Sequence, residues 1–284
     1  ITVAVLMFVA SLLMRDRVAG IILKSLSDDI TTKFEIGSVN LSFLKRFPKA
    51  TLDLKNVLVH SSPGFDRTCF GNMDTDTLLS ARSVTMEFSM TDVIKGIYNI
   101  EKIGIREGIL QILTDTAGLV NYEITSEDAL SSGNDLVINL EGVNFTDIKS
   151  IYDNRATQLI IAGVMENGRL KSKISGSDID FTAKGDLRID LFKLYNFSIA
   201  KNIETEVDVS LQSKNECIHF DKSTLVFDNN KFSMNGFVSS DDVLDLSVDG
   251  ENIDVSQIKD YLPEDLRNKL TAYDPSGVLK VKSK

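Results

Sequence analysis

Short runs in which apolar and polar residues alternate recur along most of this 284-residue chain. In one such run, Val84, Met86 and Phe88 are interleaved with Thr85 and Glu87. Successive side chains of a β-strand point to opposite faces of a sheet, so this two-residue period predicts strands with one apolar and one wet face. The chain is therefore expected to be mainly β.

The pairing of these strands follows from the segments between them. Beyond residue 136 the alternating runs are short and closely spaced, and the connections are too short for the crossovers that parallel strands need. We therefore expect an antiparallel meander. Asn167-Gly168 is expected to form a hairpin turn, Lys184-Gly185-Asp186 another turn, and Glu107-Gly108 the join between two strands.

The first 14 residues carry no charge, and Arg15 to Arg17 follow them. A bilayer-spanning helix needs about 20 apolar residues, so residues 1–17 are interpreted as a truncated transmembrane anchor. A cleaved signal peptide, with Val9-Ala10-Ser11 near its cleavage site, is the alternative. The residues predicted to lie in the membrane are Val5, Leu6, Phe8, Leu12 and Leu13.

The remaining sequence predicts four further segments. Apolar residues at helical spacing over residues 18–36 predict an amphipathic helix that caps the end of the β-structure. Residues 37–124 form a membrane-proximal β region, and the polar residues 125–135 form a linker or loop. Residues 136–284 form the β-meander, with a helical segment near 254–271, and we expect the meander to continue beyond residue 284.

Composition and motifs argue against several function classes. The net charge of −10 and the scattered lysines argue against a nucleic-acid partner. No nucleotide-binding, zinc-protease or nucleophile-elbow motif is present. His60 and His219 are predicted to be ordinary side chains, and Cys69 and Cys217 to be unpaired thiols. We therefore expect no catalytic residue, no metal, no cofactor and no enzymatic activity.

Two stretches carry a recognisable pattern: FLKRFPKATLDLKNVLV at residues 43–59 and ARSVTMEFSMTDVIKGIYNIEKIGIREGILQILTDTAGLVNYEI at residues 81–124. With the apolar N-terminal segment before them, they resemble the AsmA-like family of Gram-negative envelope proteins. The family often has proline at the position of Gly108. The resemblance implies an inner-membrane anchor that carries a periplasmic β-rich groove, related to bridge-like lipid transfer proteins.

The resemblance favours one long, curved, antiparallel sheet that forms an open groove; a closed sandwich is the structural alternative. The expected function is lipid binding or lipid transfer in support of outer-membrane lipid homeostasis, with a phospholipid or other acyl lipid and the inner membrane as partners. The side chains expected to face the acyl chains on the concave face are Val84, Met86, Phe88, Met90, Ile179, Phe181, Ile189, Val207, Val209, Phe227 and Met234.

Two other functions stay open on the sequence. One is an envelope assembly or scaffold factor that holds client outer-membrane proteins through a β-edge or the apolar face. The other is a secreted, adhesin-like β-protein, which requires cleavage of the N-terminal segment.

Overall fold

The computed structural model describes residues 20, 24, 30–46, 49–89, 92, 100–124, 142–175, 178–199, 202–214, 217–239, 244–258, 261–262, 267–269, 273 and 276–283. The chain divides into two compact units, residues 1–156 (unit 1) and residues 157–284 (unit 2). Strands dominate both units, which confirms the predicted mainly-β class.

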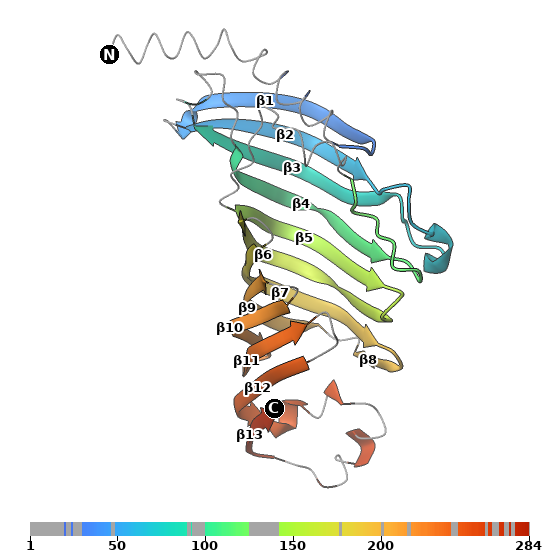
Figure 1. Cartoon of the computed structure of the whole chain (residues 1–284), viewed down its shortest axis with the longest axis vertical. Helices are drawn as coiled ribbons and strands as arrows, with labels where there is room; N and C mark the ends of the chain where they lie inside the picture. The colour runs from blue at the N-terminus through green and yellow to red at the C-terminus, as the bar shows by residue number, and fades with distance from the viewer. Residues whose placement is uncertain are drawn as a thin grey trace. The chain divides into compact units, whose positions relative to one another are not determined.

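Unit 1 contains five strands that lie side by side in chain order (Figure 1). They are β1 (Phe34–Arg46), β2 (Lys49–His60), β3 (Thr77–Ser89), β4 (Ile100–Thr114) and β5 (Gly142–Asn154). The short 3-10 helix η1 (Arg67–Phe70) lies in the loop between β2 and β3. Strand β1 begins three residues before Gly37, so residues 34–36 belong to the sheet and not to the predicted capping helix.

The pairing of β4 with β5 corrects one prediction. These two strands run parallel, with Lys102 opposite Gly142 and Thr114 opposite Asn154. The expectation of antiparallel pairing throughout the sheet is therefore wrong here. The connection runs from residue 115 to residue 141, well beyond the dozen or so residues that a parallel return requires.

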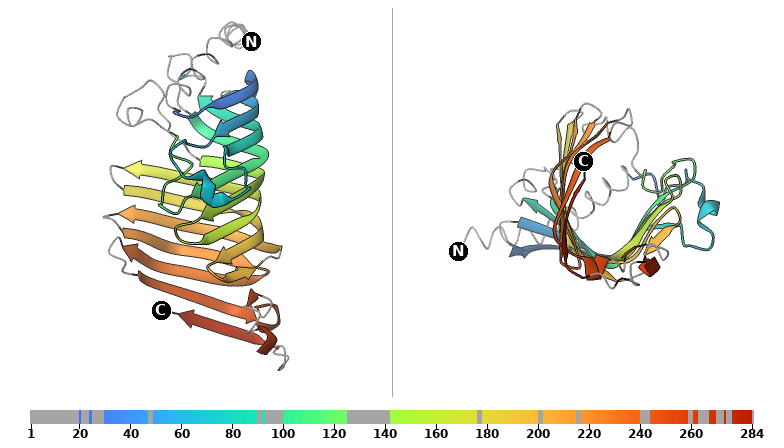
Figure 2. Two further views of the ribbon diagram at one scale, coloured as in Figure 1. Left: turned by 90° about the vertical axis from the view of Figure 1, so that its right-hand side faces the viewer. Right: turned by 90° about the horizontal axis from the view of Figure 1, so that it is seen from below.

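Unit 2 has the predicted meander. Its strands are β6 (Leu159–Ser175), β7 (Asp178–Leu194), β9 (Ile203–Lys214), β10 (Cys217–Phe227), β11 (Asn230–Ser239), β12 (Leu244–Asp254) and β13 (Val278–Ser283). Each is antiparallel to the next, and the short β8 (Phe197–Ile199) pairs with the end of β7. The one-turn helix α4 (Val255–Ile258) follows β12. Figure 2 shows that the long strands are bent along their length.

Three predicted turns are in fact the interiors of strands. β6 passes through Asn167-Gly168, β7 passes through Gly185, and β4 passes through Gly108. Gly168 and Gly185 pair directly, and a Cβ atom on Gly185 would collide with the backbone of β6. A Cβ atom on Gly108 would likewise collide with the carbonyl oxygen of Ser80. These glycines therefore allow close approach of neighbouring backbones, which is the other common role of glycine in a strand.

Hydrogen bonds of the Asn121 side chain link the loop after β2 to the end of β4. Asn121 is completely buried, and its Nδ2 donates to Ser61 Oγ at 3.1 Å and to the Gln111 carbonyl at 2.9 Å. Its Oδ1 accepts from the Leu113 amide at 2.9 Å. A buried amide that satisfies both its donor and its acceptor specifies one arrangement of these segments.

In each unit the strands lie in a single sheet, and no second sheet packs on it among the residues described. The alternative of a closed sandwich is therefore not seen within either unit. The described part of the chain holds no helix whose length and apolarity would suit a bilayer crossing. The predicted anchor residues Val5, Leu6, Phe8, Leu12 and Leu13, and the linker 125–135, lie outside the described residues.

Candidate functional site

The apolar face of unit 1 is closed. Val84, Met86 and Phe88 lie on the same face of β3, and their side chains are 5%, 7% and 0% exposed. They are neighbours of the equally buried Leu52 and Leu54 on β2. The structure thus places these three predicted lipid-facing residues in a protein core, and Met90 lies outside the described residues.

The apolar face of unit 2 is open by comparison. The strand registers place all seven predicted residues of this unit on one face of its sheet, since each pairs across the ladder with a neighbour of the same orientation. Six of them are half-buried, and Ile179 is 39% exposed. These seven are Ile179, Phe181, Ile189, Val207, Val209, Phe227 and Met234. The two-residue period therefore predicted their common face correctly.

A cavity of about 400 Å³ lies on this face. Ligand pockets in proteins commonly have volumes of about 300–1,000 Å³ and apolar walls with a few polar groups. Here Asn230 and Tyr261 are the polar residues of the lining. The apolar residues of the lining are Ile189, Phe192, Ile199, Ile203, Leu225, Phe227, Phe232, Met234 and Val248.

Sequence reasoning named three of these residues as site residues: Ile189, Phe227 and Met234. Leu225 and Phe232 belong to alternating runs of the same kind, so the two-residue period was the signal that could have added them. Tyr261 had no such signal, because it follows β12 and reaches the cavity only through the folding of the chain after that strand.

The cavity lies near the ends of several strands, where a tight turn joins β10 to β11. Asp228 and Asn229 form its two central positions with φ of 43° and 71°, the backbone that a type I′ turn requires. Asn230 follows the turn and is 2% exposed. Its Nδ2 donates to Gln257 Oε1 at 2.9 Å, and its Oδ1 accepts from the Asp254 amide at 2.8 Å. Asn230 therefore ties the turn to helix α4.

Asp254 caps the start of α4. Its Oδ1 accepts from the Ser256 amide at 2.9 Å and from the Ser256 hydroxyl at 2.6 Å. The hydrogen bond from the Ser256 hydroxyl holds the pKa of Asp254 below its usual range, with the Ser256 amide as the next cause. The cap fixes the start of the segment that leads to Tyr261.

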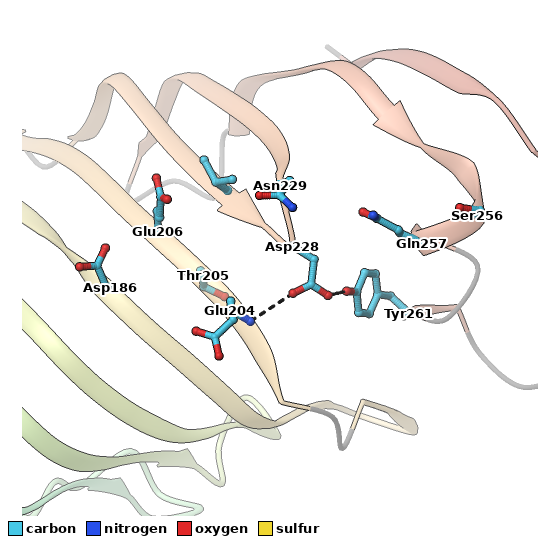
Figure 3. A pocket seen from close by; sticks show the side chains of 10 residues that line it. Asp186, Glu204, Thr205, Glu206, Asp228, Asn229, Ser256, Gln257 and Tyr261 are labelled. Carbon is cyan, nitrogen blue, oxygen red and sulfur yellow. Dashed lines mark hydrogen bonds between the residues drawn. The ribbon is translucent and has the colours of Figure 1, made fainter.

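A second, polar pocket adjoins the same turn (Figure 3). Four carboxylates line it, those of Asp186, Glu204, Glu206 and Asp228. The Tyr261 hydroxyl donates a hydrogen bond to Asp228, and the Glu204 amide donates to Asp228 Oδ1 at 3.2 Å. Tyr261 lines both pockets, so it lies where apolar and acidic surfaces meet.

The histidines and cysteines, which often serve as catalytic or metal-binding residues, line neither of these two pockets. His60 contacts Asp76 at 2.7 Å, and His219 lies against the ring of Phe237 with centroids 5.7 Å apart. Cys69 and Cys217 are both free thiols, in line with the prediction. Over the ranges that the structure describes, no group of three or more His, Cys, Asp or Glu is placed to hold a metal ion.

Comparison with models of known protein families finds no match, and comparison with curated proteins finds no significant similarity either.

Proposed function

We propose that unit 2 binds an acyl lipid on its apolar face. In this proposal the chain is an inner-membrane-anchored periplasmic protein that binds or transfers lipid in support of outer-membrane lipid homeostasis. The observation that carries it is the half-exposed apolar face of unit 2, with a cavity of about 400 Å³ lined mainly by aliphatic and aromatic side chains. Large apolar patches of this kind mark interaction sites on folded proteins.

An acyl chain suits this surface for a simple energetic reason. Each methylene removed from water contributes about 0.8 kcal/mol, and the contribution needs no particular hydrogen bond. The lining offers apolar contact from five neighbouring strands, β7, β9, β10, β11 and β12. At about 4.8 Å between strands, these span roughly 19 Å. The cavity therefore supplies a long apolar surface and few polar partners, as a hydrocarbon tail requires.

The placement in the envelope rests on the resemblance to AsmA-like proteins in residues 43–59 and 81–124. The same resemblance supports the open groove as the form of the lipid-binding surface.

The test compares two adjacent positions of β11 that face opposite ways. Met234 lines the cavity, and Ser233 lies on the other face of the same strand. The protein is purified without detergent, and lipid is read by native mass spectrometry and by solvent extraction. We expect co-purified acyl lipid with the wild-type protein and with Ser233→Asp, and strongly reduced lipid with Met234→Asp.

Circular dichroism controls for folding of both variants. Lipid-free, monodisperse wild-type protein would refute the proposal, and so would equal lipid loading of the two variants. A photo-crosslinker placed at Phe181, on the same face, addresses the alternative function. Crosslinks to lipid support the proposal, whereas crosslinks to outer-membrane proteins would favour the assembly or scaffold role instead.

A further inference from the structure

The side chains that line the apolar cavity of unit 2 offer a ligand almost no hydrogen-bonding group. Nine of the eleven lining residues that the structure describes have aliphatic, aromatic or thioether side chains. None of these nine side chains carries a hydrogen-bond donor, and the sulfur of Met234 is only a weak acceptor. The polar character of the lining therefore depends on Asn230 and Tyr261.

The side chain of Asn230 is already occupied by the protein. It is 2% exposed, and its Nδ2 donates to Gln257 Oε1 at 2.9 Å and to the carbonyls of Phe227 and Asp228, each at 3.2 Å. Its Oδ1 accepts from the Asp254 amide at 2.8 Å. A buried amide whose donors and acceptor are engaged in this way has no hydrogen bond to give to a ligand.

Tyr261 and the backbone are occupied as well. The Tyr261 hydroxyl donates its proton to Asp228, so its ring is what remains for the cavity. Each of the nine apolar lining residues belongs to a strand and is paired with a residue of a neighbouring strand. Paired strands bond their N–H and C=O groups to one another, so the lining offers a ligand packing contacts alone.

We propose that the cavity selects acyl chains whose hydrocarbon carries no hydroxyl group. A plain methylene chain loses no hydrogen bond when it leaves water for this lining. A hydroxyl in the middle of the chain gives up its water and finds no partner there, which is the costly way to bury a polar group. This inference rests on the proposed function, because it specifies the class of acyl chain that the same cavity accepts.

The test uses octadecanoic acid and a series of its monohydroxy isomers, in which the hydroxyl is moved along the chain from the carbon beside the carboxylate. All the isomers have the same composition, so their affinities differ only through the position of the hydroxyl. Affinity for the full chain is measured by displacement of a fluorescent fatty acid in detergent-free buffer. We expect mid-chain isomers to bind about tenfold more weakly than the isomer substituted beside the carboxylate, an effect typical of a buried hydroxyl without a partner.

A threonine in the lining should relieve this discrimination. Val248 on β12 lines the cavity, and Val248→Thr introduces a hydroxyl there with little change in shape. This variant should regain affinity for some of the mid-chain isomers. The matched control is Val226→Thr on β10, since Val226 is also half-buried but lines the polar pocket instead. The control should keep the tenfold discrimination, and binding of octadecanoic acid by both variants controls for their folding.

Equal affinities of the wild-type protein for all the isomers would overturn the inferred selectivity and leave lipid binding intact. The same selectivity is overturned if the mid-chain isomers bind no better to Val248→Thr than to the wild-type protein, or if Val226→Thr relieves the discrimination equally. If neither octadecanoic acid nor any of its isomers displaces the fluorescent fatty acid, the proposed function itself is refuted.

Discussion

Two phenylalanines that share the same sequence pattern should respond very differently to truncation. Phe88 on β3 is completely buried, whereas Phe181 on β7 is half-buried on the open face of unit 2. Replacing a fully buried phenylalanine by alanine removes its burial and leaves a cavity, at a cost of about 3–5 kcal/mol. Full burial of such a side chain contributes about 1.5–3 kcal/mol, so the partial burial of Phe181 corresponds to about 1 kcal/mol.

The two effects can be separated by hydrogen exchange read by mass spectrometry on peptides from β3 and from β7. Exchange reports the free energy of opening for each region by itself, so the measurement does not require the whole chain to unfold as one unit. We expect Phe88→Ala to lower protection in β3 by the larger amount and to leave lipid loading unchanged. Phe181→Ala should lower protection in β7 only slightly and should reduce lipid loading.

An equally large loss of protection for Phe181→Ala would refute this reasoning, since it would mean that protein covers Phe181 as completely as Phe88. A loss of lipid loading with Phe88→Ala and none with Phe181→Ala would refute it too, because the lipid would then occupy unit 1.

Three further substitutions test the features that hold unit 1 together. Asn121→Ala breaks three side-chain hydrogen bonds and should cost about 3 kcal/mol in chemical denaturation, while Asn144→Ala, at a half-buried position of β5, serves as the control. Gly108→Ala drives a methyl group into the neighbouring backbone and should cost about 3 kcal/mol, whereas Gly64→Ala, with open space around its Cβ position, should change stability by less than about 0.5 kcal/mol. Backbone hydrogen bonds, foremost that from the Asp66 amide, hold the pKa of Asp115 below its usual range. Because the pKa of Asp115 is lower in the folded state, its carboxylate stabilises the fold at pH values above its unfolded-state pKa, near 4, and this stabilisation is lost as the pH falls through the folded-state pKa. The difference in free energy of unfolding between the wild-type protein and Asp115→Asn should therefore be constant above about pH 5 and should become smaller below about pH 4. If this difference in free energy of unfolding became larger at low pH, the result would contradict a lowered pKa for Asp115.

The sequence predicted the local features well, because they depend on near neighbours in the chain. The alternation of apolar and polar residues correctly placed seven side chains on one face of unit 2, since the geometry of an extended backbone determines that pattern. The turn at Asp228-Asn229 and the cap at Asp254 are local features of the same kind, because a short polar side chain that bonds its own backbone acts within a few residues.

The roles of three glycines could not be predicted from neighbouring residues in the chain. Gly108, Gly168 and Gly185 were interpreted as turn or join residues, and the structure places all three inside strands. A glycine serves a turn by its freedom at positive φ and serves a sheet by its lack of a side chain. The sequence of the segment is the same in both cases, so the neighbouring strand decides between them.

What the sequence by itself determined is the strand content, the apolar face of each strand and the absence of known catalytic motifs. Only the tertiary structure decided that Val84, Met86 and Phe88 are buried while Phe181, Phe227 and Met234 line an accessible face. Only the tertiary structure also brought Tyr261 to the lining of both the apolar cavity and the acidic pocket. The physical reason is that alternation specifies which way a side chain points, whereas burial depends on what else packs against that face, and those contacts come from residues distant in the chain.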